Sequence, residues 1–207
     1  MKKIILLALI SSVALFTTLE TNATLLTAEF NVDNGYRAYI STSDSIQGIL
    51  FGSGNNWTTT LTNTTTLAVA TDYYLHVEAY DQGGIAGFLG EFTLSGTDHI
   101  FANSTLHLLT NTTAWKGNNL GWGNPYLPSL TDLGLNGVSP WGNRPNIPGT
   151  ARWIWAGNAN DNNTAWFSTK ISSTTASIPE PAAMLLFGAG IAGLAGVRVK
   201  RKNLFEL

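Results

Sequence analysis

The central part of the chain alternates apolar and polar residues with the two-residue period of β-strands. Over residues 72–81, Leu75 and Val77 share one face of the expected strand, and His76 and Glu78 share the opposite face. Alternation of this kind predicts strands with one buried and one exposed face. The region between the two ends of the chain shows no convincing helical period, so we expect strands throughout.

Clusters rich in glycine and asparagine separate the expected strands. The cluster at 82–84 lies between the strand at 72–81 and an apolar strand at 85–94, so we expect these two strands to form a hairpin. Another strand, at 36–41, follows an Asn-Gly pair, which tolerates the positive φ angles of a tight turn.

Two tryptophan-containing strands, at 152–155 and 165–171, flank an asparagine-rich loop at 157–164, and we expect a second hairpin there. Short strands joined by Gly, Asn and Pro turns predict an all-β fold, namely an antiparallel β-sandwich of jelly-roll type over residues 24–171. Residues 116–149 are rich in Gly, Asn and Pro and are expected to form a long ordered loop or insertion.

The N-terminal end has a different pattern. Two lysines precede an apolar run at 4–16, and small residues at 21–23 follow a polar stretch. The run is shorter than the roughly 20 residues that span a bilayer. We therefore expect a signal peptide over 1–23 that is cleaved after Ala23, with an uncleaved N-terminal anchor as the alternative.

A second apolar segment, at 182–197, contains no charged residue and predicts a transmembrane helix. The basic cluster that follows it is expected to stay on the cytoplasmic side and stop transfer. Small, polar residues at 172–177 are expected to form a flexible linker between the domain and this helix. The residues of the expected membrane stop are Arg198, Lys200, Arg201 and Lys202.

Composition narrows the class of protein further. Residues 24–177 contain five Lys or Arg against ten Asp or Glu, so this region is mildly acidic and offers no basic stripe to nucleic acid. The chain has no cysteine, which excludes disulfides, thiol catalysis and Cys-ligated metals. All seven tryptophans lie in this region, where they can build a substantial core.

The segment Ile178-Pro179-Glu180-Pro181 directly precedes the C-terminal apolar run. Pro-Glu-Pro, an apolar helix and a terminal basic cluster, in this order over 178–202, resemble the PEP-CTERM sorting signal of Gram-negative bacteria that make extracellular polysaccharide. The resemblance implies that a membrane-embedded transpeptidase, an exosortase, recognises and cleaves the Pro-Glu-Pro region. The prolines prevent the membrane helix from extending into this region and keep it accessible. An ordinary tail anchor is the alternative.

Five segments of the central region, 33–40, 52–57, 76–81, 83–88 and 153–167, combine glycine, asparagine or acidic residues with aromatic residues. They resemble pieces of the galactose-binding-like jelly rolls that accompany many glycoside hydrolases. The chain departs from that pattern because its paired-tryptophan strands come last, whereas they usually open those modules. The resemblance therefore implies a sandwich but leaves the strand order open.

Aromatic residues in the expected loops are candidates for a sugar-binding site. Exposed Trp and Tyr rings stack on sugar rings, while Asn, Asp and Arg supply oriented hydrogen bonds. Packing inside the core or a loop is the alternative for each of them. Trp153, Trp155 and Trp166 lie in expected strands and are assigned to the core. The candidate glycan-binding residues are Trp57, Trp115, Trp122, Tyr126 and Trp141.

Signals for catalysis and metal binding are weak. Glu78 and Glu91 are a conceivable acid–base pair of a glycosidase, but exposed strand positions explain them better. The three histidines lack close metal-ligand spacing, and the common hydrolase and metalloprotease motifs do not occur. Oxygen-rich residues at 158–162 are interpreted as a turn rather than a calcium site. We therefore expect no catalytic residue, no metal and no cofactor.

Together with the resemblance, these observations predict a non-enzymatic protein that is exported across the inner membrane of a Gram-negative bacterium. We expect a membrane-anchored precursor, an exosortase-type partner, and final association with exopolysaccharide at the cell surface or in the extracellular matrix. A structural matrix or ice-interacting protein is the alternative, favoured by the threonine-rich stretch 58–71. A glycoside hydrolase is the least favoured interpretation.

Overall fold

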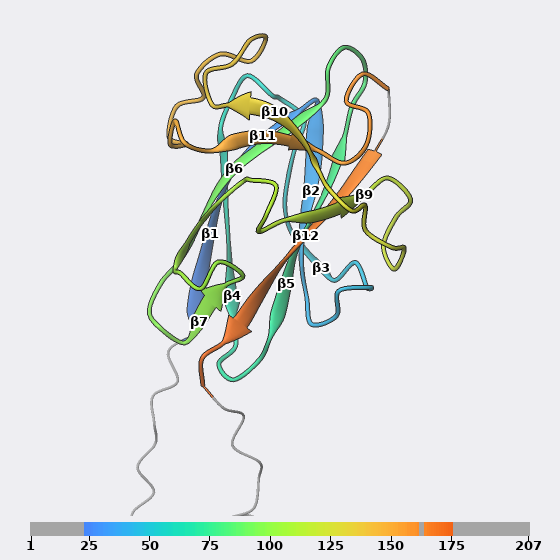
Figure 1. Cartoon of the computed structure of the whole chain (residues 1–207). Helices are drawn as coiled ribbons and strands as arrows, with labels where there is room; N and C mark the ends of the chain where they lie inside the picture. Colours follow the sequence, from blue (N-terminus) through green and yellow to red (C-terminus); the bar gives the residue numbers. More distant parts are fainter. Residues whose placement is uncertain (1–22, 162–163, 176–207) are drawn as a thin grey trace, which may run out of the picture.

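The computed structural model describes residues 23–161 and 164–175, which form two antiparallel β-sheets packed as a sandwich (Figure 1). These residues contain no helix, so the predicted all-β sandwich is confirmed. The strands of the first sheet, sheet A, are β1 (Thr24–Asp33), β4 (Leu61–Leu67), β6 (Gly87–Leu94), β8 (His107–Leu109), β10 (Thr131–Leu135) and β11 (Arg152–Trp155). Their order is β10-β11-β6-β1-β4, and β8 also pairs with β6.

The second sheet, sheet B, packs against the first. Its strands are β2 (Gly35–Ser41), β3 (Ile49–Gly54), β5 (Tyr73–Tyr80), β7 (His99–Phe101), β9 (Lys116–Asn118) and β12 (Thr164–Ser173). Their order is β3-β2-β5-β12-β7, and β9 also pairs with β12. Within this sheet the longest pairing joins β5 to β12 over eight residues, and both strands lie in the interior of the sheet.

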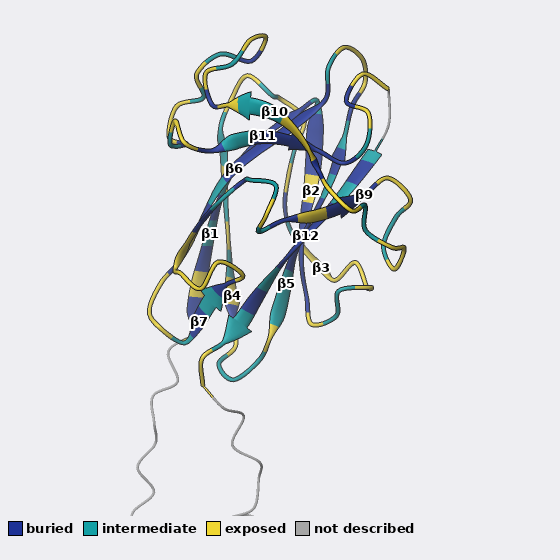
Figure 2. Cartoon of the chain, in the orientation of Figure 1, coloured by how far each residue is buried: buried dark blue, intermediate teal, exposed yellow. Residues whose placement is uncertain are grey.

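The alternation of the sequence places one face of each sheet in the core between them. Most residues of β1, β2, β6 and β11 are buried, whereas the loops are largely exposed (Figure 2). Phe88 lies at the centre of the core, where its ring contacts those of Phe30, Trp115 and Phe167. Burying each such ring contributes on the order of 2 kcal/mol, so these contacts hold the sheets together.

Both predicted hairpins are wrong. β5 belongs to sheet B and β6 to sheet A, so residues 82–84 carry the chain from one sheet to the other. The same holds for β11 and β12, which lie in different sheets on either side of the asparagine-rich loop. Glycine-rich turns fit either connection, because the turn sequence limits the backbone angles but does not specify which sheet receives the next strand.

A second apolar cluster covers part of the outer face of sheet A, over β6 and β11. The rings of Trp141 and Trp153 stack with centroids 4.4 Å apart, and Ile147 and Leu89 pack against them. The indole N–H of Trp141 donates a hydrogen bond of 2.9 Å to Asp33. The segment 116–149, predicted as a long ordered loop or insertion, therefore contains β9 and β10, and its second half packs a small apolar cluster against β6 and β11.

The start of β1 and the end of β12 lie at the same end of the sandwich (Figure 1). Thr24 shares a hydrogen bond of 2.8 Å with His99, and Ser173 is opposite His99 in the pairing of β12 with β7. The backbone N–H of Ala70 donates to the hydroxyl of Thr175. The first residues of the predicted linker, 172–175, are therefore part of the sheet or hydrogen-bonded to its loops.

Candidate functional site

Charged and aromatic side chains are aligned across the outer face of sheet B. The strand register places Arg37, Glu78 and Trp166 side by side on β2, β5 and β12. The residues that follow Arg37 and Trp166, Ala38 and Phe167, are completely buried in the core. Since successive side chains of a strand point to opposite faces, the aligned row lies on the outside of the sandwich.

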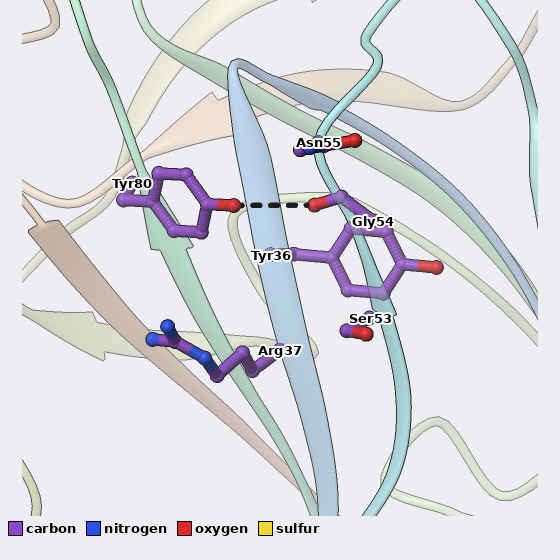
Figure 3. Close-up of a pocket in the computed structure, with 6 residues that line it drawn as sticks. All are labelled: Tyr36, Arg37, Ser53, Gly54, Asn55 and Tyr80. Carbon is purple, nitrogen blue, oxygen red and sulfur yellow. Dashed lines mark hydrogen bonds between the residues drawn. The ribbon is translucent and has the colours of Figure 1, made fainter.

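A shallow pocket opens beside this row. It has a volume of about 340 Å³ and lies where β5 ends and β2 begins. Tyr80 lies on one side of β2 and Gly54 on the other, and the tyrosine hydroxyl donates a long hydrogen bond of 3.5 Å to the carbonyl of Gly54 (Figure 3). The lining residues are Tyr36, Arg37, Ser53, Gly54, Asn55 and Tyr80.

Gly35 allows the ring of Tyr80 to lie across β2. A Cβ atom at this position would lie 2.4 Å from the hydroxyl oxygen of Tyr80 and 2.7 Å from the carbonyl oxygen of Gly54. Neither distance is possible for a real side chain, so the glycine is required for the close approach. The Asn-Gly pair that the sequence marks as a turn thus also shapes the pocket.

Hydrogen bonds join the polar groups in and beside the row. Glu78 accepts hydrogen bonds from Tyr39 at 3.0 Å and from Arg37 at 3.4 Å. The guanidinium of Arg37 also lies over the ring of Tyr80, 5.8 Å from its centroid. Partial burial and the neighbouring Glu78 raise the pKa of Tyr39, which keeps its hydroxyl a hydrogen-bond donor. The arrangement offers fixed donors and acceptors between aromatic side chains, the chemistry that polar ring-shaped ligands require.

Two of the five predicted glycan-binding residues are inaccessible. Trp115 and Trp141 are 2% and 1% exposed, and each packs inside an apolar cluster. Trp57 is partly exposed but lies against the cluster on sheet A, with the guanidinium of Arg144 5.3 Å from its ring centroid. These three rings therefore do not form a common platform with the other two.

The remaining two candidates, Trp122 and Tyr126, lie together over sheet B. Trp122 stacks on His76 with the ring centroids 4.3 Å apart and meets the edge of Tyr39. Tyr126 donates a hydrogen bond of 2.7 Å to Asp44. Trp122 adjoins the aligned row through Tyr39, which donates a hydrogen bond to Glu78. The hydroxyl of Tyr126 is already hydrogen-bonded to Asp44.

Trp166 and Tyr80 were not predicted as candidates from the sequence. Trp153 and Trp155 are completely buried, as predicted, but Trp166 is partly exposed on the outer face. The signal was present in the alternation, because Trp166 lies between the buried residues Ala165 and Phe167. Its strand position alone suggested a core residue, and only the face of the strand decides its exposure.

The two carboxylates considered for a glycosidase are far from forming a pair. Glu78 lies on the outer face of sheet B, whereas Glu91 lies in β6 of sheet A, opposite Glu29 of β1. Glu91 also contacts His107. Partial burial and the charge of Glu91 raise the pKa of Glu29. Carboxylates on opposite outer faces of a sandwich cannot act on the same glycosidic bond.

The threonine-rich stretch contributes to the outer face of sheet A. Thr27 is opposite Thr64 on one side and Thr93 on the other, which forms a row of three threonines across the sheet. Glu29 and Glu91 form the neighbouring row on the same outer face, where their carboxylates interrupt the threonine surface. The face is therefore a mixed polar surface, and the threonines do not form an unbroken regular array.

The asparagine-rich loop forms a turn in the residues that the structure describes. Asn158 donates a side-chain hydrogen bond to Asp161 and accepts one from the backbone of Asn160. Asn162 lies outside the described residues. Within 23–161 and 164–175, no group of three or more His, Asp or Glu side chains is placed to hold a metal ion.

Residues 177–202 match the family model of the PEP-CTERM protein-sorting motif. The chain carries a PEP-CTERM sorting motif. The match includes Pro179, Glu180 and Pro181 and extends through the basic cluster to Lys202. A PEP-CTERM motif indicates export, processing of a membrane-anchored precursor, and an exosortase as the processing partner.

The family match does not extend to the central domain. No curated protein and no solved structure matches the chain. None of the described residues forms a helix long and apolar enough to cross a membrane. The predicted membrane helix at 182–197, the PEP-CTERM motif and nearly all of the predicted signal peptide lie outside the described residues.

Proposed function

We propose that this PEP-CTERM protein is a non-catalytic, carbohydrate-associated module of the cell surface or extracellular matrix. Its sugar-binding surface is the outer face of sheet B, with Tyr80 and Trp166 as stacking rings and Arg37 and Glu78 as hydrogen-bonding groups. The observation that carries the proposal is the alignment of Arg37, Glu78 and Trp166 beside an open pocket that Tyr80 lines. The sorting motif supports it, because the motif routes the protein out of the cell.

Several features of the surface suit a polysaccharide. The pocket is open and shallow, so it can accept part of a chain that continues in both directions. Side chains of Ser53 and Asn55 at its rim add neutral hydrogen-bonding groups. Each ring stacked on a sugar contributes on the order of 1 kcal/mol, and micromolar affinity requires about 8 kcal/mol. Binding through this surface is therefore weak for one sugar and stronger for an extended chain.

The absence of catalysis is part of the proposal. Glu78 is bonded to Arg37 and Tyr39, and Glu91 lies on the other sheet. The site thus offers one carboxylate in a fixed network, whereas glycoside hydrolysis ordinarily needs two that flank the bond. The expected result is binding of the polysaccharide without a change in its chain length.

Affinity electrophoresis tests the proposal. Residues 24–175 are run through gels that contain the exopolysaccharide of the bacterium that makes the protein. Trp166→Ala and Tyr80→Ala should each weaken retardation about fivefold, the equivalent of about 1 kcal/mol. Trp57→Ala is the matched control, because this partly exposed tryptophan lies on the sheet A side. Circular dichroism confirms that each variant is folded.

Two results would count against the proposal. The first is a wild-type domain that migrates unretarded in the host polysaccharide and in common plant and bacterial glycans. The second is binding that Trp57→Ala removes and Trp166→Ala leaves intact, which would place the site on the other sheet. Shortening of the polysaccharide on incubation with the domain would contradict the non-catalytic assignment.

A further inference from the structure

Exposed aliphatic side chains gather at one edge of sheet B. Ile49 and Leu50 of β3 are 74% and 54% exposed, and Ile46 in the preceding loop is 63% exposed. These three lie within five residues of sequence. The other exposed large apolar residues of the described chain are scattered: Leu25, Leu106, Leu120 and Leu135.

The backbone of β3 is also unpaired on its outer side. β3 is the last strand of sheet B and pairs with β2 alone. Among the described residues, no backbone hydrogen bond joins β3 to another strand on the side away from β2. A row of free N–H and C=O groups beside exposed aliphatic side chains is a template for the addition of another strand.

This edge lacks the charges that normally protect edge strands. Residues 45–71 contain no Asp, Glu, Lys or Arg, and they include both β3 and β4. These two strands are the edges of the two sheets on one side of the sandwich, and they contact each other. By contrast, β9 carries Lys116, and β10 carries Asp132 in an ion pair with Arg152. Edge strands of monomeric proteins usually carry such charges or proline.

We propose that β3 pairs antiparallel with β3 of a second copy of this chain, so that the two B sheets form one continuous sheet. An antiparallel pair of identical strands is related by a two-fold axis and is self-complementary. Because the segment is uncharged, no like charges meet in the pair, and a charged partner finds no complementary group there. Ile49 and Leu50 of each copy become covered by the other copy.

The pairing has a consequence for the outer surface. A two-fold axis perpendicular to the joined sheet places the outer faces of both B sheets on the same side. The pockets, which include Ser53 and Gly54 of β3, then face the same direction in the dimer. The inference rests on the edge itself and holds whether or not these pockets bind sugar.

Single cysteines test the pairing in the full chain, which has no cysteine of its own. Ile49→Cys, Leu50→Cys and Ser53→Cys place one thiol along β3, and Leu135→Cys is the control on the edge of sheet A, with 47% exposure in the wild type. Membranes and secreted fractions are treated with a short bismaleimide and separated under denaturing conditions. We expect a covalent dimer from at least one β3 position and little from Leu135→Cys.

A charge placed in the pair provides the second measurement. In the Ser53→Cys background, Leu50→Lys brings two like charges together and should reduce the dimer yield at least about tenfold, whereas Leu135→Lys should leave it unchanged. Both positions are exposed, so neither substitution disturbs the core. Three results of the cross-linking would each overturn the proposal. They are no covalent dimer from any β3 position, an equal dimer yield from Leu135→Cys, and a product with the mass of a different partner. An unaffected yield in Leu50→Lys would do the same.

Discussion

His76 is a buried histidine beneath an aromatic cover. Its side chain is completely inaccessible, with Trp122 stacked on one face. Nδ1 lies 3.2 Å from the carbonyl of Gln47, and Nε2 lies 3.6 Å from Asp44, beyond hydrogen-bond distance. Burial lowers the pKa of His76 below its ordinary 6.5, and the nearby carbonyl and carboxylate offset this only in part. The folded protein therefore holds His76 neutral at a pH where the unfolded chain protonates it.

This difference predicts a loss of stability in mild acid. As the pH falls below 6.5, the unfolded state binds more protons, so the free energy of unfolding decreases by up to about 1.4 kcal/mol per pH unit. His76→Phe keeps a ring beneath Trp122 and should flatten the dependence between pH 7 and 5. Urea unfolding at several pH values measures the slope for both proteins. Equal slopes would assign the dependence to another group.

At the scale of elements, the long segment between β9 and β11 has two distinct parts. Its first part places Trp122 over sheet B, partly exposed, and its second part buries Trp141 against Trp153 on sheet A. An alanine at a buried tryptophan leaves a cavity, whereas solvent can fill the space left by a partly exposed ring.

Trp141→Ala should therefore destabilise the domain by about 3–5 kcal/mol, and Trp122→Ala by clearly less. Trp141→Ala also leaves the buried carboxylate of Asp33 without its indole partner. Thermal or urea unfolding of the two variants measures the difference. If Trp122→Ala costs as much, the first part of the segment is as firmly packed as the second, contrary to this description.

The sequence predicted five strands at their positions, but not their partners; these strands are β2, β5, β6, β11 and β12. Alternation correctly predicted β5, because burial of one face is a property of each strand by itself. It gave no information on whether β6 pairs with β5 or crosses to the other sheet, since both connections bury the same faces. Contacts between Asp33 and Trp141, 108 residues apart, likewise leave no local signal.

At the scale of the whole molecule, the candidate site depends on which face each strand presents. Aromatic residues in loops were expected to be exposed, yet Trp115 and Trp141 are buried. Trp166 lies in a strand but faces outward. The position of the sorting motif was predictable, because its parts are consecutive in sequence. The proposed binding surface is assembled from β2, β3, β5 and β12, and its position depends on the strand register.

The sorting motif provides a prediction for the complete protein. Replacing Pro179, Glu180 and Pro181 together by alanine should let the predicted apolar helix extend through the processing region, so we expect the protein to remain in the inner membrane. A triple alanine substitution of Asn203, Leu204 and Phe205, just beyond the matched motif, is the control. Fractionation and immunoblotting of the cells measure release, and undiminished release of the Pro-Glu-Pro variant would show that the motif is not used.

The shared end of β1 and β12 determines how the domain bears mechanical load. Ser173 lies at that end, and the pocket at Tyr80 lies at the other, eight paired residues away along β5 and β12. Force between a ligand in the pocket and the C-terminal attachment runs parallel to the strands and loads all their hydrogen bonds at once. Force between Thr24 and Ser173 instead pulls on one end of β1 and one end of β12, which lie in different sheets, so the hydrogen bonds of each strand to its own neighbours break one after another. Unfolding single molecules by pulling on residue 55 and Ser173 should therefore need more force than pulling on Thr24 and Ser173. Equal unfolding forces in the two geometries would contradict this expectation.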